Sequence, residues 1–223
     1  MLLLYKFAAY SHTLKSKFSD PWESVADHLS AHDWVILDDF LPEAETIAAR
    51  NYLKKKLAKD AFKVAGIGAL HDFRVEKSVR SDEIYWLDPR RDPEVEGFFS
   101  LAEAVKAHLN RLCFLSISGS EFHFAHYPPG SFYKKHIDQF DARSNRLISM
   151  VCYINEFWEP EHGGELRLYR GDGTFKDVAP LPGRAVLFKS DRVPHEVLES
   201  KASRYSITGW LLHQPAGLGY LLG

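Results

Sequence analysis

The stretch YKKHID, residues 133–138, decides how the fold of this chain is interpreted. Side chains two positions apart in an extended strand point to the same face of a sheet. His136 and Asp138 therefore share a face, and an imidazole and a carboxylate at that spacing can bind one metal ion. Alone, the pair is weak evidence, because a chain with 11 His and 30 Asp plus Glu contains polar strand ends by chance.

A third candidate ligand, His195, lies in the segment DRVPHEV at 191–197. Two histidines and one carboxylate form the facial ligand set of non-haem Fe(II) sites, which leaves three coordination positions open. Apolar strands and the turn Gly163-Gly164 separate His195 from the first two ligands. This order of segments strengthens the metal hypothesis.

Arg204 follows His195 by nine positions, a spacing that predicts two neighbouring strands joined by a tight turn at 198–202. Period two places Arg204, Ser206, Thr208 and Trp210 on one face. An inward-facing arginine is costly unless it meets an anion. A bidentate pair with the carboxylate of a dicarboxylate co-substrate would supply that anion.

The composition limits the class of protein. With 223 residues, 45% of them hydrophobic and 13% aromatic, the chain can bury one substantial core, so a single domain over residues 1–223 is expected. A formal net charge of −2 gives no reason to expect a nucleic acid as partner. No stretch is long and apolar enough to predict a membrane span. Only Cys113 and Cys152 are present, which predicts no disulfide framework and favours a cytoplasmic location.

Turn and period signals predict an α+β fold. Helices are expected over about 21–32, 42–60 and 93–112, with strands at 35–37 and around 84–86. From residue 117 onward, short strands are separated by Gly and Pro turns. The expected architecture is a double-stranded β-helix, or jelly roll, at about 117–213, with support from 1–116 and N-terminal helices bracing its major sheet.

These residues resemble the Fe(II)- and 2-oxoglutarate-dependent oxygenases, and more narrowly the EGL-nine-like prolyl hydroxylases related to the hypoxia-inducible-factor enzymes, in a bacterial branch. The general likeness rests on His136-x-Asp138, His195 and Arg204. The narrower likeness covers most of the chain from about Trp34 onward, and its segments are RSDEIYW at 80–86, YP at 127–128, Tyr133, RLISMVCYIN at 146–155, GGELR at 163–167, PHEV at 194–197 and RYSITGW at 204–210.

The resemblance implies a role for each matching residue. His136, Asp138 and His195 would hold Fe(II), and Arg204 with Tyr153 would bind the far carboxylate of 2-oxoglutarate. The residues that would line that pocket are Tyr127, Tyr133, Val151, Leu166 and Val197. Trp210 is implied near the reacting centre, and Arg80 with Asp82 in an element that closes over a proline-containing substrate. Independently of the resemblance, period two places Leu147, Ser149, Val151 and Tyr153 on one face.

The resemblance further implies the activity: a dioxygenase that hydroxylates a proline in a protein or peptide, consumes O2 and 2-oxoglutarate, and releases succinate and CO2. Ascorbate is an accessory reductant that the family suggests. Three rival functions remain open. They are a small-molecule hydroxylase with the same iron site, a nucleic-acid demethylase, and a non-enzymatic β-barrel binding protein, which would have no need of Arg204.

The chain also departs from the family pattern. The loop between Tyr127 and His136 is one residue shorter than expected, and His123 and His126 stand where the animal enzymes carry non-basic residues. His123 shares the parity of Tyr127, and we expect it to be a hydrogen-bonded strand histidine near the pocket. Arg80 and Asp82 are expected to pair with each other, at the surface or at the base of a mobile loop.

Overall fold

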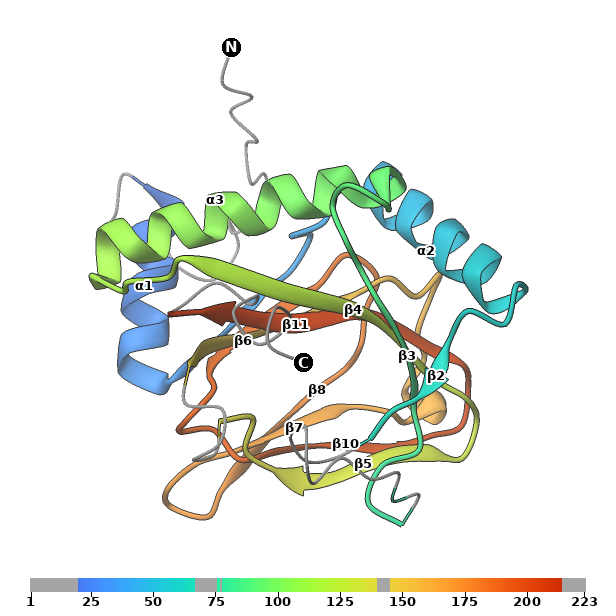
Figure 1. Cartoon of the computed structure of the whole chain (residues 1–223). Coiled ribbons are helices and arrows are strands. Elements are labelled where there is room, and N and C mark those ends of the chain that lie inside the picture. The colour runs from blue at the N-terminus through green and yellow to red at the C-terminus, as the bar shows by residue number, and fades with distance from the viewer. Residues whose placement is uncertain (1–19, 67–75, 77, 140–144, 214–223) are drawn as a thin grey trace.

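The structure is a computed structural model that describes residues 20–66, 76, 78–139 and 145–213. Three helices lie on one side of a large antiparallel sheet, and a smaller sheet lies on its other side (Figure 1). The helices are α1 (Pro21–His32), α2 (Glu43–Leu57) and α3 (Glu96–Cys113). In the described part of the chain, none of the helices is long and apolar enough to cross a membrane.

The two sheets form the jelly roll. In spatial order the major sheet contains β1 (Trp34–Leu37), β9 (Ala185–Lys189), β6 (Arg146–Tyr153), β11 (Arg204–Leu212), β4 (Gly119–Tyr127), β3 (Glu83–Trp86) and β2 (Lys63–Val64). The minor sheet contains β5 (Ser131–His136), β10 (His195–Ser200), β7 (Leu166–Tyr169) and β8 (Phe175–Val178). The predicted α+β jelly roll with bracing helices is confirmed.

Local sequence signals explain where the helices begin. The Asp20 side chain accepts a hydrogen bond from the backbone of Trp22 at 3.0 Å, and Pro21 occupies the first turn of α1. The helix predicted from Pro93 starts as a short 3-10 turn, Pro93–Val95, and continues as α3. The expected helices and strands are present, with boundaries shifted by a few residues.

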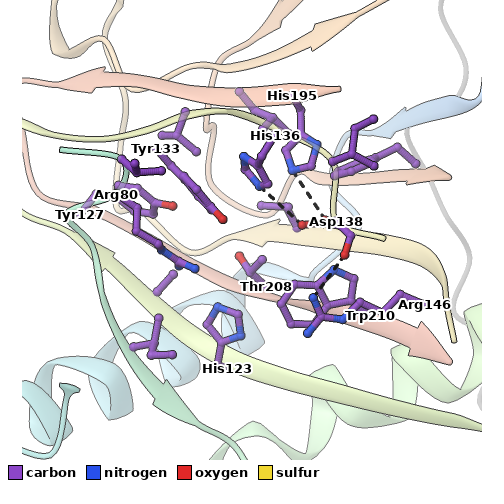
Figure 2. A pocket seen from close by; sticks show the side chains of 18 of the residues that line it. Arg80, His123, Tyr127, Tyr133, His136, Asp138, Arg146, His195, Thr208 and Trp210 are labelled. Atoms are coloured by element: carbon purple, nitrogen blue, oxygen red, sulfur yellow. Dashed lines mark hydrogen bonds and ion pairs between the residues drawn. The ribbon is translucent and has the colours of Figure 1, made fainter. Parts of the chain in front are cut away.

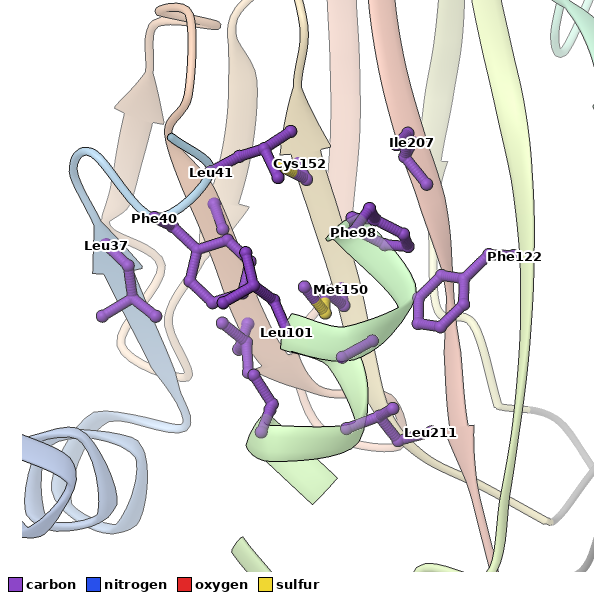
Figure 3. Close-up of a cluster of buried hydrophobic side chains, with 14 of the residues drawn as sticks. Leu37, Phe40, Leu41, Phe98, Leu101, Phe122, Met150, Cys152, Ile207 and Leu211 are labelled. Atoms are coloured by element: carbon purple, nitrogen blue, oxygen red, sulfur yellow. The ribbon is translucent and has the colours of Figure 1, made fainter. Parts of the chain in front are cut away.

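Alternation along each strand of the major sheet builds two separate cores. On β4, Phe122 and Phe124 face the helices, whereas Ala125 and Tyr127 face the space between the sheets. Figure 3 shows the helix-side core, where Phe98 and Leu101 of α3 lie over the strands. Because of this alternation, the side chains on the inner face of the major sheet line the site.

The prediction that β10 and β11 are neighbours within one sheet is wrong. The strand β10 belongs to the minor sheet and β11 to the major sheet, so residues 201–203 cross from one sheet to the other. The crossing is held by the Ser200 hydroxyl, which donates to the Ala202 carbonyl at 2.7 Å. As a result, His195 and Arg204 begin strands on opposite walls of the space between the sheets.

Candidate metal centre and anion pocket

Strand register brings the two histidines together. His195 on β10 lies directly opposite His136 on β5, and their ring centroids are 4.2 Å apart. Asp138 follows the end of β5 and turns toward both rings (Figure 2). His136 Nε2 lies 3.5 Å from Asp138 Oδ1, and His195 Nε2 lies 3.6 Å from Asp138 Oδ2. One ligand atom from each residue lies within 4.8 Å of the others, so the three can hold one metal ion.

Backbone carbonyls orient both imidazoles for metal binding. His136 Nδ1 lies 2.8 Å from the Lys134 carbonyl, and His195 Nδ1 lies 3.0 Å from the Val193 carbonyl. Because a carbonyl oxygen only accepts, each Nδ1 carries the hydrogen and each Nε2 keeps a free lone pair. Both lone pairs therefore face the Asp138 side of the site, the arrangement that a shared metal requires.

The electrostatics of this site favour the forms that bind metal. Burial by itself would raise the pKa of Asp138, but His195, His136 and the Ser149 hydroxyl hold that pKa far below its usual range. Burial, assisted by the neighbouring His136, lowers the pKa of His195 to about 4. An ionised carboxylate beside a neutral imidazole is the donor chemistry that Fe(II) accepts.

Arg204 supplies a buried positive charge on the opposite wall. Its side chain is 1% exposed, and Nε donates to the Gly164 carbonyl at 2.9 Å. The guanidinium carbon lies 4.9 Å and 5.0 Å from the ring centroids of Tyr127 and Tyr153. Among the described residues, no carboxylate lies within ion-pair distance of this guanidinium. A charge this deeply buried calls for an anion, which a bound carboxylate would provide.

Two neighbours of Arg204 fit the same interpretation. Gly164 has a φ of 68°, and a Cβ there would lie 3.2 Å from Arg204 Cδ and 2.8 Å from Ser200 Oγ. The Tyr153 hydroxyl is buried and has no well-directed hydrogen bond to another described residue. A carboxylate bound to Arg204 would give this hydroxyl an acceptor.

The metal-ligand cluster and Arg204 open onto one cavity of about 480 Å³. The cavity is lined by the five residues that the resemblance implied for the co-substrate pocket: Tyr127, Tyr133, Val151, Leu166 and Val197. Tyr153 lies behind the cavity wall, against Arg204. An apolar cavity with a few convergent polar groups is the usual form of a small-ligand site.

Of the two positions expected for the pair of Arg80 and Asp82, the surface and the base of a mobile loop, the surface is wrong. Asp82 is completely buried, and Arg80 donates to it through Nε at 2.8 Å and Nη2 at 2.6 Å. The Arg80 guanidinium also lies 4.3 Å over the Tyr133 ring, which stacks on His136 with centroids 3.7 Å apart. The cause is β5, which covers this segment: Ser81 N donates to the Phe132 carbonyl at 3.1 Å. The pair is thus a buried brace beside the metal ligands.

The remaining wall contains Trp210, as expected, together with three residues that the site prediction omitted: Trp86, Arg146 and Thr208. The period-two alternation along their strands indicates that Trp86 and Thr208 face the site, because each shares the parity of a predicted site residue. Ser149 was placed on the inward face but given no role, although its hydroxyl contacts Asp138.

His123 also lines this wall. The expectation that its ring is hydrogen-bonded is wrong, because its buried Nδ1 has no partner among the described residues.

Comparison with known proteins agrees with this geometry. The model of the 2OG-Fe(II) oxygenase superfamily matches residues 122–212. A crystal structure of a prolyl-4-hydroxylase from Pseudomonas putida is 34% identical, with a TM-score of 0.79, over 86% of this chain and 99% of that one. A prolyl hydroxylase from Trichoplax adhaerens, solved with a hypoxia-inducible-factor peptide fragment, is 27% identical with a TM-score of 0.79, over 86% of this chain and 89% of that one.

A curated relative, the hypoxia-inducible factor prolyl hydroxylase of Caenorhabditis elegans, is 31% identical over 85% of this chain. The match spans only 28% of the length of that relative. The structure from Pseudomonas putida, by contrast, is covered almost from end to end. The fold, the His-Asp-His cluster and these matches together show that the chain belongs to the 2OG-Fe(II) oxygenase superfamily, among members that resemble the hypoxia-inducible-factor-type prolyl hydroxylases.

Proposed function

We propose that this chain is an Fe(II)- and 2-oxoglutarate-dependent dioxygenase that hydroxylates a proline in a protein or peptide substrate. One observation carries the proposal: a buried arginine without a carboxylate partner among the described residues shares a cavity with a His-Asp-His cluster. A metal ligand set alone fits many proteins. A buried guanidinium in the same cavity fits a co-substrate that carries a carboxylate at its far end.

Each group of site residues has one role in this proposal. His136, Asp138 and His195 hold Fe(II), which together with 2-oxoglutarate and O2 supplies the oxidising chemistry. Arg204 and the Tyr153 hydroxyl bind the far carboxylate and set the depth of the co-substrate. The apolar side chains of Val151, Leu166 and Val197 exclude water from its carbon chain. The protein orients and shields the reactants, and none of these side chains acts as an acid or a base.

The relatives support a proline-containing substrate. The protein from Trichoplax adhaerens was solved with a peptide, and the one from Pseudomonas putida is described as a prolyl-4-hydroxylase. In this chain, the cavity wall includes Trp86, whose side chain is 39% exposed and can contact an incoming peptide. We further propose a single domain over residues 1–223 and ascorbate as an accessory reductant. We also propose a cytoplasmic location, which the presence of only two cysteines favours.

The direct test is succinate formation by purified protein supplied with iron and 2-oxoglutarate, with the Asp138→Ala variant as control. We expect succinate from the wild type only, and only when both additions are present. Absence of succinate from iron-loaded wild type would favour a binding protein. Succinate formation that is stimulated by small amino acids and by no proline-containing peptide would favour a small-molecule hydroxylase.

A further inference from the structure

His123 lines one wall of the cavity but has no role in the reaction proposed above. His123 on β4 lies directly opposite Trp86 on β3 and Thr208 on β11, so the three side chains form one row across the major sheet. All three line the cavity. Figure 2 shows His123 across the open space from the ligands His136 and His195.

The His123 ring is buried without the contact to a backbone carbonyl that His195, the other buried histidine of the described residues, makes. It is 3% exposed, and Nδ1 has no partner among the described residues. At the metal centre, by contrast, the Nδ1 atoms of His136 and His195 are each bonded to a backbone carbonyl. A buried polar atom without a partner is costly to the fold, so its presence at a ligand cavity indicates that a ligand completes it.

The surroundings of His123 determine what kind of group could bind there. The ring centroid of Trp86 lies 4.9 Å away and that of Trp210 lies 5.7 Å away. The indole nitrogen of Trp210 is also buried without a partner in the described structure, and an indole N–H can only donate. Burial lowers the pKa of His123 to about 3, assisted by the nearby positive charges of Arg80 and Arg146, so the ring is neutral and retains one N–H. Arg80 and Arg146 are paired with Asp82 and Glu121, so the corner offers the indole N–H and one imidazole N–H as donors, and its complement is an acceptor oxygen.

We propose that His123 is a substrate-binding residue that donates a hydrogen bond to an acceptor oxygen next to the target residue and thereby sets peptide specificity. The inference rests on the proposed function and names the contact that would distinguish one peptide from another. The aromatic faces of Trp86 and Trp210 give the apolar ring of a proline a surface to pack on. The acceptor is either a backbone carbonyl of the peptide or a carboxylate of a flanking acidic residue.

A purely structural role makes a different prediction. If His123 only fills space between two tryptophans, an apolar residue of similar volume would serve equally well for every substrate. If His123 binds substrate, removing its nitrogens should weaken the peptide interaction and leave the iron and co-substrate steps intact. A side chain with a polar atom near the position of Nδ1 should restore part of the interaction.

The test uses His123→Leu, which removes both nitrogens, and His123→Asn, which keeps a donor near the position of Nδ1. The matched control is His126→Leu on the same strand, because His126 faces away from the cavity toward Glu83 and Tyr205. The probes are short synthetic peptides with one central proline and either neutral or acidic flanks. Three quantities are measured: peptide KM and kcat, succinate formed without peptide, and peptide affinity for Mn(II)-loaded protein by calorimetry.

We expect His123→Leu to raise peptide KM and weaken peptide affinity about tenfold, the effect of one lost hydrogen bond to a buried group. Succinate formation without peptide should be unchanged, and His123→Asn should recover part of the affinity. A larger loss with acidic flanks identifies a carboxylate as the acceptor, and an equal loss identifies a backbone carbonyl.

Two results would overturn the inference and leave the proposed function standing: wild-type peptide affinity in His123→Leu, or equal loss of coupled and uncoupled turnover in both His123 variants. The second result also covers a variant that folds poorly, because asparagine and leucine would then fail alike. The proposed function itself fails by a different result, in which wild-type protein forms succinate and hydroxylates none of the peptides.

Discussion

The hydroxyl of Ser149 lies 2.6 Å from Oδ2 of Asp138 and donates a hydrogen bond to it. Ser149 is on β6 of the major sheet, whereas Asp138 follows β5 of the minor sheet. The same hydroxyl lies 2.9 Å from the Ser190 hydroxyl. This bond therefore fixes the carboxylate ligand against the opposite sheet and ties the two sheets together at the metal centre.

Ser149→Ala should weaken divalent metal binding by about 10–100-fold, the usual effect of removing a hydrogen bond to a metal ligand. Ser190→Ala is the matched control, because Ser149 can still donate to Asp138 in that variant. The measurement is a titration with Co(II), followed by its absorption spectrum. Equal Co(II) affinity in wild type and Ser149→Ala would show that the bond has no part in orienting the ligand.

Arg204→Ala should abolish detectable 2-oxoglutarate binding, because loss of a desolvated carboxylate partner costs on the order of 3–5 kcal/mol. Arg204→Lys should retain weak binding, since lysine keeps the charge and loses the two-pronged geometry. Co(II) binding is the control and should remain in both variants. Calorimetric titration of the Mn(II)-loaded proteins with 2-oxoglutarate checks this, and unchanged affinity would remove Arg204 from the pocket.

Asp82→Ala should lower the free energy of unfolding by about 3–5 kcal/mol, because it leaves the Arg80 guanidinium buried without its partner. Replacing both residues together, as Arg80→Met with Asp82→Leu, should recover much of this stability and still impair peptide hydroxylation. Glu156→Ala, which removes an exposed ion pair with Lys54, is the control and should change little. Urea unfolding measures all three, and wild-type stability of Asp82→Ala would contradict the buried brace.

Asp92 should make part of the stability dependent on pH. Its buried carboxylate accepts hydrogen bonds from the Tyr52 hydroxyl at 2.7 Å and the Tyr85 hydroxyl at 2.9 Å. Burial alone would raise the pKa of Asp92, but the Asp88 backbone N–H, Arg91 and these hydroxyls lower it to about 2. Since the unfolded value is near ~4, the stabilisation is complete above that pH and disappears as the pH falls toward the folded value.

Asp92→Asn should therefore be less stable than wild type at neutral pH, by about 1–3 kcal/mol for loss of a buried charged acceptor. The difference should narrow as the pH is lowered from about 4 to about 2, where the wild-type carboxylate becomes protonated. Urea midpoints for the two proteins across this range measure the effect. A difference that is independent of pH would mean that the carboxylate charge does not stabilise the fold.

Period-two alternation predicted much of the site from sequence. Val151 and Tyr153 share a face with Ser149, and Arg204 shares one with Trp210, as the structure shows. Leu147, predicted on the same face as Ser149, instead packs against the helix-side core, because the register of β6 shifts beside it. This succeeds because the direction of each side chain along a strand is a local property of the backbone. The spacing of His136 and Asp138, taken with His195 later in the chain, likewise predicted the cluster that the structure brings together.

The errors concern contacts between distant segments. Asp82 is buried because β5, about fifty residues later in the chain, covers it, and no local pattern of Arg80 and Asp82 contains that information. The turn after His195 connects two sheets, and its length alone fits a hairpin equally well. Whether the His123 ring has a hydrogen-bond partner depends on which side chains the strands β3, β4 and β11 place in one corner of the cavity.

Hydroxylation of proline with Fe(II) and 2-oxoglutarate is the activity that we propose for this chain. The most direct test supplies 18O2, iron and 2-oxoglutarate to wild-type protein and to Asp138→Ala, together with cell lysate and the proline peptides, and searches for oxidised residues by mass spectrometry. We expect proline residues that gain one labelled oxygen with wild type only, in an amount that does not exceed the succinate formed. Succinate without any labelled proline, or labelled proline with Asp138→Ala, would contradict it.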